Sequence, residues 1–226
     1  MGTIRWLREV GFDDVVSVGG KAAALGALAR AGFRVPEGFV IPTIGGIPAP
    51  RRDEEILAAF RVLMAPRVAV RSSATVEDGG AASWAGQLET FLNTDEEHLL
   101  ENIERCRASA RSARAEAYAE ERGVAAACVA VIVQVMVPAE VAGVAFSVHP
   151  VTGAREPVIE AVRGLGDALV SGRAEPEDDA LTAEQAREVA GLVLRVESFL
   201  GYPVDMEWAM ARGIIYVLQA RPITTI

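Results

Sequence analysis

The chain has 226 residues, 51% of them hydrophobic, which is enough to form one sizeable core or two small lobes. Its formal net charge of −9, from 31 acidic and 22 basic residues, argues against a surface built to neutralise nucleic-acid phosphates or anionic lipids. The longest apolar run, Val124–Val133, is shorter than a bilayer requires, and Arg5 and Arg8 interrupt the N-terminal residues where a signal peptide needs a continuous apolar run. We therefore expect a cytoplasmic protein that binds neither nucleic acid nor a membrane.

Helices and strands alternate through the first part of the chain. The alanine-rich segment that begins near Gly20 and Lys21 predicts a helix, and Gly32 suits its C-terminal end because glycine tolerates a positive φ. Residues 72–87, SSATVEDGGAASWAGQ, contain too much Ser, Gly and Ala for a regular element, so we expect an extended loop of a length that usually carries function. The remaining patterns predict strands over residues 34–41 and 67–71 and helices over residues 53–64 and 98–121.

Strands dominate the second part of the chain. Residues 125–137 are nearly all apolar and β-branched, which predicts a central strand buried on both faces. We expect residues 141–148 and 157–161 to be its neighbours in the sheet. Residues 204–210 and 214–219 flank a short turn and predict a terminal β-hairpin.

The clearest helix lies between these strands, over residues 181–201. Thr182 and Gln185 have the spacing of a capping box, in which each side chain bonds the backbone N–H of the other residue. Apolar residues follow at helical spacing, and Gly201 provides the stop. The segment therefore predicts an amphipathic helix.

The terminal hairpin brings polar side chains together. If Gly213 lies near the centre of the turn, Glu207 lies opposite Gln219 and Asp205 lies opposite Arg221. A carboxylate beside an amide oxygen suits Mg²⁺, which takes oxygen ligands and shares them with nucleotide phosphates, and a guanidinium can bind a phosphate. These four residues by themselves nevertheless favour the simpler interpretation of a cross-strand salt bridge on a solvated face.

Two basic residues in the first part of the chain suit an anion. Lys21 follows Gly19 and Gly20 at the start of the first predicted helix, where backbone N–H groups and the helix dipole favour negative charge. The segment is not a Walker A loop, because it lacks the upstream glycine spacing and the Ser or Thr after the lysine, so it is weak evidence alone. Arg71 ends a predicted strand, where an anion clamp and an ordinary strand terminus are about equally good interpretations.

The loop over residues 72–87 contains the segment SWAGQ, residues 83–87. Its small residues allow backbone amides to approach a ligand and close over a triphosphate. The alternative is a plain surface loop, in which Trp84 either packs beneath the loop or covers a ligand.

The order of these features resembles the ATP-binding domain shared by phosphoenolpyruvate synthases, pyruvate phosphate dikinases and rifampicin phosphotransferases. The resemblance extends from Val18 to Thr224, and its length and order exclude chance. It rests on the segments VGGKAAALGAL, VPEGFVI, VAVRSSATVEDGGAASWAGQLETFLN, VIVQVMVPAEVAGVAFSVHPVTG, VIEAVRGLGDALVSG, DMEWAM and YVLQARPIT.

The resemblance implies an α/β fold of the ATP-grasp type, in which two lobes, residues 1–133 and 134–226, hold ATP between their sheets. It implies roles for four groups of residues. Lys21, Arg71 and Arg221 would be the catalytic contacts to the phosphates; Ser83, Gly86 and Gln87 would belong to the phosphate-covering loop; and Gln134, Met136 and Val137 would form the hinge that meets adenine through backbone groups. Glu207 and Gln219 would hold Mg²⁺.

The chain also departs from the family pattern. Residues 43–66 replace a longer helical segment, and a stretch of strands and loops that normally follows VSGR is missing. His149 stands where the family more often has an acidic or amide residue, and we interpret this as variation in a loop. The swivel domain with its phosphate-carrying histidine and the pyruvate-binding barrel have no counterpart, and the chain has two histidines, His98 and His149.

These departures leave three functional hypotheses. The favoured one is the ATP-binding half of a split dikinase-like phosphotransferase that works with a separately encoded His-domain partner. The second is a self-contained ATP-grasp kinase or ligase that activates an unknown small-molecule acceptor. The third is a non-catalytic nucleotide-binding module, which the joint presence of Lys21, Arg71, Glu207 and Gln219 disfavours.

Overall fold

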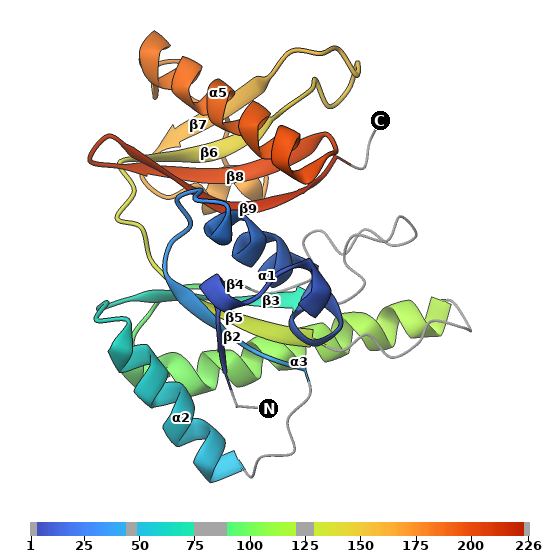
Figure 1. The fold of residues 1–226 in the computed structure, drawn as a ribbon, viewed down its shortest axis with the longest axis vertical. Helices are drawn as coiled ribbons and strands as arrows, with labels where there is room; N and C mark the ends of the chain where they lie inside the picture. Colours follow the sequence, from blue (N-terminus) through green and yellow to red (C-terminus); the bar gives the residue numbers. More distant parts are fainter. Residues whose placement is uncertain (1–3, 44–48, 75–89, 121–128, 224–226) are drawn as a thin grey trace. The chain divides into compact units, whose positions relative to one another are not determined.

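A computed structural model describes residues 4–43, 49–74, 90–120 and 129–223. The chain divides into two compact units, each built on its own antiparallel sheet (Figure 1). The N-terminal unit comprises Met1–Arg30 and Pro36–Met136, and the C-terminal unit comprises Ala31–Val35 and Val137–Ile226. The lobes expected from the family resemblance, residues 1–133 and 134–226, stay a prediction.

The N-terminal unit contains a five-stranded sheet with the order β1-β2-β5-β3-β4, in which all neighbouring strands are antiparallel. The central strand β5 is buried along both faces, as its apolar sequence predicts. The strands are β1 (Arg5–Trp6), β2 (Gly38–Ile41), β3 (Val68–Ala74), β4 (Thr90–Thr94) and β5 (Val129–Val135). The helices are α1 (Val15–Arg30), α2 (Ala49–Val62), α3 (Glu96–Glu120) and the short 3-10 helices η1 (Leu7–Glu9) and η2 (Phe12–Asp14).

Helices cover both faces of this sheet. Helices α2 and α3 lie on one face, where Val68 and Val70 of β3 pack with Ile56, Leu99 and other buried apolar residues (Figure 1). Helix α1 lies on the opposite face, against β3 and β5. Because side chains alternate along a strand, Ala69, Arg71 and Ser73 of β3 point to the α1 side.

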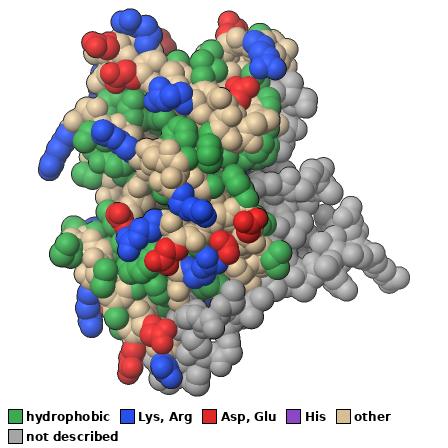
Figure 2. Space-filling view, viewed as in Figure 1, with side chains coloured by type: hydrophobic (Ala, Val, Ile, Leu, Met, Phe, Trp, Pro, Cys, Tyr) green, Lys and Arg blue, Asp and Glu red, His purple; other side chains and the backbone are tan. Residues whose placement is uncertain are grey.

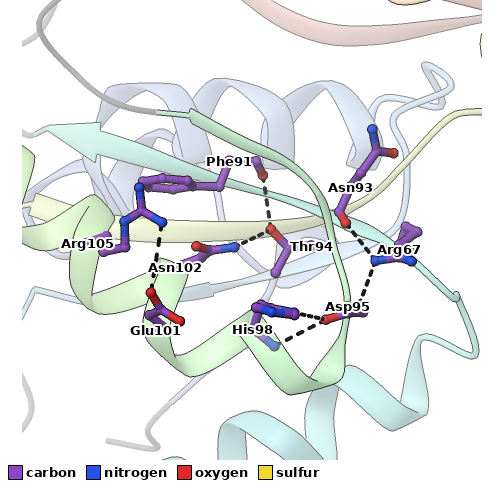
Figure 3. A network of polar contacts seen from close by, with 9 residues as sticks. All are labelled: Arg67, Phe91, Asn93, Thr94, Asp95, His98, Glu101, Asn102 and Arg105. Carbon is purple, nitrogen blue, oxygen red and sulfur yellow. Dashed lines mark hydrogen bonds and ion pairs between the residues drawn. The ribbon is translucent and has the colours of Figure 1, made fainter.

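A polar network attaches β4 to the start of α3 (Figure 3). The Asp95 carboxylate accepts the backbone N–H of His98 at 3.2 Å, which caps the first turn of α3, and also contacts His98 Nδ1 at 2.7 Å. Arg67 donates to Asp95 Oδ2 at 2.6 Å and to the backbone oxygen of Asn93, which lies near the end of β4 and has a φ of 55°. The network leaves His98 on the exposed side of the helix, as the sequence predicts.

The C-terminal unit contains a four-stranded antiparallel sheet with the order β7-β6-β8-β9. The expectation that residues 141–148 and 157–161 neighbour the strand over 125–137 is therefore wrong, because they pair in the second sheet. An apolar pattern predicts which faces of a strand are buried, but it does not specify the partner strand. The elements are β6 (Val141–Phe146), β7 (Val158–Arg163), β8 (Val204–Ala211), β9 (Ile214–Pro222), α4 (Asp167–Val170) and α5 (Ala183–Leu200).

Helix α5 packs on one face of this sheet with its predicted apolar stripe inward. The capping box is confirmed, because Gln185 N–H donates to Thr182 Oγ1 at 3.2 Å and Thr182 N–H donates to Gln185 Oε1 at 2.9 Å. Gly201 ends the helix with a φ of 82°. Gln185 also contacts the sulfur of Met210, which shows that this face of β8 points toward α5.

Backbone contacts cover both edges of the second sheet. Val217 N–H of β9 donates to the Arg34 oxygen at 2.8 Å, so the segment 31–35 lies along that edge. Glu177 N–H donates to the Ala161 oxygen of β7 at 2.8 Å. Such contacts satisfy edge groups that would otherwise be free to pair with another chain.

The sequence has more acidic than basic residues, but the face drawn in Figure 2 shows no single acidic patch, and acidic and basic side chains are interspersed there. Nor does this face show a basic stripe of the kind that tracks nucleic acid. No helix within the part of the chain that the structure describes is both long and apolar enough to cross a membrane.

Candidate functional site

The β8–β9 hairpin places its polar residues in the predicted pairs. Glu207 lies opposite Gln219, and Asp205 lies opposite Arg221. Both carboxylates lie on the face of β8 that points away from α5, because they alternate with the residues that face the helix. The period of two identifies which residues of β8 share this face, but their partners on β9 also depend on the register.

The predicted pairing depends on a β-bulge that the sequence did not reveal. The turn consists of Arg212 and Gly213 alone, both with positive φ, and a regular ladder from a two-residue turn would place Glu207 opposite Leu218. The register instead shifts between Glu207 and Trp208, so that Leu218 is the additional residue on β9 and Gln219 becomes the partner.

Asp205 and Arg221 form a cross-strand ion pair, as expected if the hairpin residues make a salt bridge. Arg221 Nε donates to Asp205 Oδ2 at 2.9 Å, and its Nη2 lies 2.8 Å from the same oxygen. The Asp205 side chain is 12% exposed and the Arg221 side chain is 45% exposed. Burial raises the pKa of the Asp205 carboxyl, the Arg221 charge opposes that shift, and the nearby Glu207 carboxylate adds to it, which leaves the pKa above its ordinary value.

The same face changes from polar to apolar along β8. Beyond Asp205 and Glu207, Ala209 and Ala211 belong to a buried cluster with Val137 and Ala142, beside the partly buried Tyr216 and Leu218. A face with charged groups at one end and small apolar groups at the other suits a ligand that has an anionic end and an apolar end.

Glu207 and Gln219 fit a magnesium ion that arrives with its own ligands. A carboxylate and an amide oxygen on partner positions are donors that Mg²⁺ accepts, and this ion usually keeps waters and substrate phosphates as its remaining ligands. Over the described ranges, no group of three or more His, Cys, Asp or Glu residues could hold a metal ion. The donor set therefore suits Mg²⁺ bound together with a phosphate, rather than an all-protein cage.

In the N-terminal unit, Lys21 lies at the start of the main part of α1. The helix is interrupted at Gly19, whose φ of 78° and ψ of 163° are not helical. Regular helix follows from Gly20, which agrees with the predicted start near Gly20 and Lys21. Ala22 N–H donates to Oγ of Ser73 on β3 at 3.1 Å, a contact that sequence reasoning missed because the two residues lie 51 positions apart.

Arg71 and Gln134 lie on the α1 face of the sheet. Arg71 alternates with the core residue Val70, and Gln134 lies opposite Ala69, so the two polar side chains are diagonal neighbours on adjacent strands. Arg71 is 8% exposed and Gln134 is 2% exposed, and the Gln134 amide donates to the Pro36 oxygen at 3.4 Å. The N-terminal unit thus brings Arg71 and Gln134 to the face that also receives the Lys21 helix.

Met136 and Val137 lie where the two compact units divide. Met136 N–H donates to the Arg67 oxygen at 3.1 Å, so a backbone contact from Met136 to a base would use its carbonyl oxygen. Val137 belongs to the apolar cluster beside Ala209. The phosphate-loop residues Ser83, Gly86 and Gln87 lie outside the described residues.

His149 acts as a turn acceptor. Its Nδ1 accepts the backbone N–H groups of Val151 at 3.2 Å and Thr152 at 3.3 Å. An Asn or Asp side chain makes similar contacts in turns, which explains how His149 replaces the acidic or amide residue of the family pattern.

Residues 49–180 and 175–226 match the family model described as "Pyruvate phosphate dikinase, AMP/ATP-binding domain". The chain belongs to this family. The two matched segments overlap at residues 175–180, shortly after the VSGR segment where we expect a stretch of the family pattern to be missing.

Curated relatives agree with this assignment. The chain is 32% identical to a probable phosphoenolpyruvate synthase of Archaeoglobus fulgidus over 99% of this chain and 42% of the relative. It is 34% identical to the phosphoenolpyruvate synthase of Aeropyrum pernix over 90% of this chain and 31% of that protein. It is 30% identical to a rifampicin phosphotransferase of a Streptomyces species, over 97% of this chain and 36% of that protein. The chain thus spans less than half the length of these relatives.

Solved structures support the fold. An ADP complex of N5-carboxyaminoimidazole ribonucleotide synthetase matches 91% of this chain and 45% of its own, with a TM-score of 0.53 and 12% identity. A D-alanine–D-alanine ligase from Bacillus anthracis matches 88% of this chain and 55% of its own, with a TM-score of 0.50 and 14% identity. The predicted α/β ATP-grasp fold is confirmed.

Proposed function

We propose that the chain is the ATP-binding phosphotransfer domain of a dikinase-like phosphotransferase, similar to phosphoenolpyruvate synthase, and that it binds ATP together with Mg²⁺. The observation that carries the proposal is the polar end of the β8–β9 hairpin, where the metal-type pair Glu207 and Gln219 lies beside the Asp205–Arg221 ion pair. The partly buried Tyr216 and Leu218 beside the adjoining apolar cluster would provide contacts for a purine base.

Four groups of residues would have distinct roles in the proposed site. Bound Mg²⁺ would neutralise part of the negative charge that the phosphates carry during transfer. Transfer of the phosphoryl group to an acceptor outside the chain depends on positioning and electrostatics, which fixed cations and backbone amides supply. Lys21, Arg71 and Arg221 would hold the phosphates; Ser83, Gly86 and Gln87 would cover them; Gln134, Met136 and Val137 would contact the base; and Glu207 and Gln219 would hold the metal ion.

The phosphate acceptor is proposed to lie outside this chain, on a separately encoded His-domain protein that passes the phosphate to a small molecule. Both histidines of the chain have other roles: His149 accepts two backbone N–H groups, and His98 contacts the carboxylate that caps α3. The curated relatives are also longer than the part of them that this chain matches. These observations favour a carrier histidine that lies outside the 226 residues of this chain.

Calorimetry of the full chain with ATP, in Mg²⁺ and in EDTA, tests the binding. We expect Glu207→Gln to weaken binding at least tenfold in Mg²⁺, about 1.4 kcal/mol, and to have little effect in EDTA. Glu160→Gln is the matched control, because Glu160 lies in the same cross-strand row but is separated from Glu207 by Val144. Absence of binding by the wild type, or equal losses for both variants, would contradict the proposal.

The products of ATP turnover distinguish the type of enzyme. Phosphorus NMR should show AMP formation only when a His-domain protein is added. ADP formation with a small molecule alone would instead identify a self-contained kinase or ligase. Mg²⁺-dependent binding with no turnover under either condition would identify a non-catalytic module.

A further inference from the structure

The start of the Lys21 helix is capped from another element of the fold. The first N–H groups of a helix have no partner within it, and the residue before the first turn normally supplies a side-chain oxygen. That position is Gly19, which has no side chain. The hydroxyl of Ser73 takes its place by accepting the Ala22 N–H at 3.1 Å, in a buried contact.

Close packing between Gly19 and Ser73 holds this cap in position. A Cβ atom added to Gly19 would lie 2.3 Å from the backbone oxygen of Ser73 and 2.4 Å from its Oγ. The φ of 78° at Gly19 also favours glycine. On the other side of the turn, Thr43 N–H donates to the Ser17 oxygen at 2.9 Å. The backbone on both sides of Gly19 is therefore attached to neighbouring strands or loops.

The cap links two residues of the proposed phosphate site. Lys21 immediately precedes Ala22, so fixing the Ala22 amide also fixes the backbone from which the Lys21 side chain extends. Ser73 and Arg71 lie two positions apart on β3 and therefore share the α1 face of the sheet. One hydroxyl thus joins the element that carries Lys21 to the strand that carries Arg71.

We propose that Ser73 is a positioning residue that holds Lys21 in place for the phosphates of the bound nucleotide by capping the helix that carries it. This inference rests on the proposed function. The neighbouring residue supplies a matched control, because Ser72 is also a buried serine but lies on the opposite face of β3, away from the α1 N-terminus.

The test is a double-variant cycle measured by calorimetry with MgATP on the full chain. We expect Ser73→Ala to raise the Kd for MgATP about five- to tenfold, which corresponds to loss of one buried hydrogen bond. Ser72→Ala should change the Kd by less than about twofold. In a Lys21→Ala background, Ser73→Ala should also change the Kd by less than about twofold, because its effect acts through Lys21.

A readout with adenosine separates positioning from general damage to the fold. Adenosine lacks phosphates, so its affinity should be the same in the wild type and in Ser73→Ala. If Ser73→Ala does not fold, Ser73→Cys fills a similar space with a weak acceptor and replaces it in the cycle. Amide hydrogen exchange at Ala22 should be faster in either variant.

Three results would overturn the inference while leaving the proposed function intact. These are an unchanged MgATP affinity in Ser73→Ala, an equal loss in the Lys21→Ala background, and an equal loss of adenosine affinity. If the wild type does not bind MgATP at all, the proposed function fails, and the role assigned to Ser73 fails with it.

Discussion

The two units hold their candidate residues in different ways. In the C-terminal unit, the ion pair of Asp205 and Arg221 joins residues 16 positions apart within one hairpin. In the N-terminal unit, the contact that supports Lys21 joins Ala22 and Ser73, which lie 51 positions apart in different elements. A hairpin joins residues that lie close together in the sequence, even where a bulge shifts the register, whereas a cap supplied by a distant strand depends on how the helix packs.

We therefore expect the two units to respond differently to substitutions. Backbone changes at Gly19 should disrupt packing between elements, because the chain there has no room for a side chain. Changes in the hairpin should act mainly through side-chain charge and turn preference, because its ladder of backbone hydrogen bonds remains.

The largest expected effect is that of Gly19→Ala. The positive φ and the clash with the Ser73 backbone together should lower the free energy of unfolding by about 3 kcal/mol or more. Gly32→Ala is the matched control, because Gly32 has a φ of 88° but an added Cβ would meet no atom within 4 Å, so only about 1 kcal/mol should be lost. Urea unfolding measures the free energy of unfolding of both variants. An equal decrease in the two variants would show that the close approach of Gly19 to Ser73 is unimportant.

The next effect concerns the two sides of the Asp205–Arg221 ion pair. Arg221→Met leaves a buried carboxylate without its charge partner and should cost about 2–3 kcal/mol. Asp205→Asn leaves a guanidinium that is already 45% exposed and should cost about 1 kcal/mol or less. Urea unfolding at neutral pH shows which of the two variants is less stable. If Asp205→Asn were the less stable variant, Asp205 would be better solvated than its burial indicates.

A smaller effect of opposite sign is expected at the hairpin turn. Arg212 has a φ of 52°, which is unfavourable for arginine and more favourable for asparagine. Arg212→Asn should raise the free energy of unfolding by about 0.5–1 kcal/mol without changing MgATP affinity, because the register is preserved. Arg212→Ala, which lacks this backbone preference, should give no gain in thermal or urea unfolding.

The smallest expected effect is the pH dependence of the stability that the Asp95–His98 pair contributes. This pair is exposed, whereas the Asp205–Arg221 pair of the C-terminal unit is partly buried. The hydrogen bond to Asp95 raises the pKa of His98, and the contacts from His98 lower the pKa of Asp95. The His98 contribution to stability is complete below about pH 6.5 and is lost as the pH rises through the raised pKa. The Asp95 contribution is complete above about pH 4 and is lost as the pH falls through the lowered pKa.

This contribution should therefore be greatest between about pH 4 and pH 6.5. An NMR titration of His98 should show the raised pKa in the wild type and a return toward the ordinary value in Asp95→Asn. Asparagine can still cap α3, so this variant removes the charge while keeping the cap. An unchanged His98 titration in Asp95→Asn would exclude the pair as the cause.

Sequence alone was sufficient wherever the relevant contact is local or periodic. The capping box of Thr182 and Gln185 and the stop at Gly201 follow from spacing along the chain, and the period of two places Asp205 and Glu207 on one face of their strand. The family resemblance supplied the fold, which the comparisons confirm, and the site roles, which stay predictions.

Only the tertiary structure decided the contacts between distant segments. It assigned β6 and β7 to the second sheet, placed Leu218 in a bulge and brought Ser73 to the start of the Lys21 helix. Strand periodicity does not encode which strand is a neighbour, and a serine shows no sign in the sequence of the distant amide it will cap. Those choices follow from packing of whole elements, because each buried N–H group needs a partner and each apolar face needs another surface.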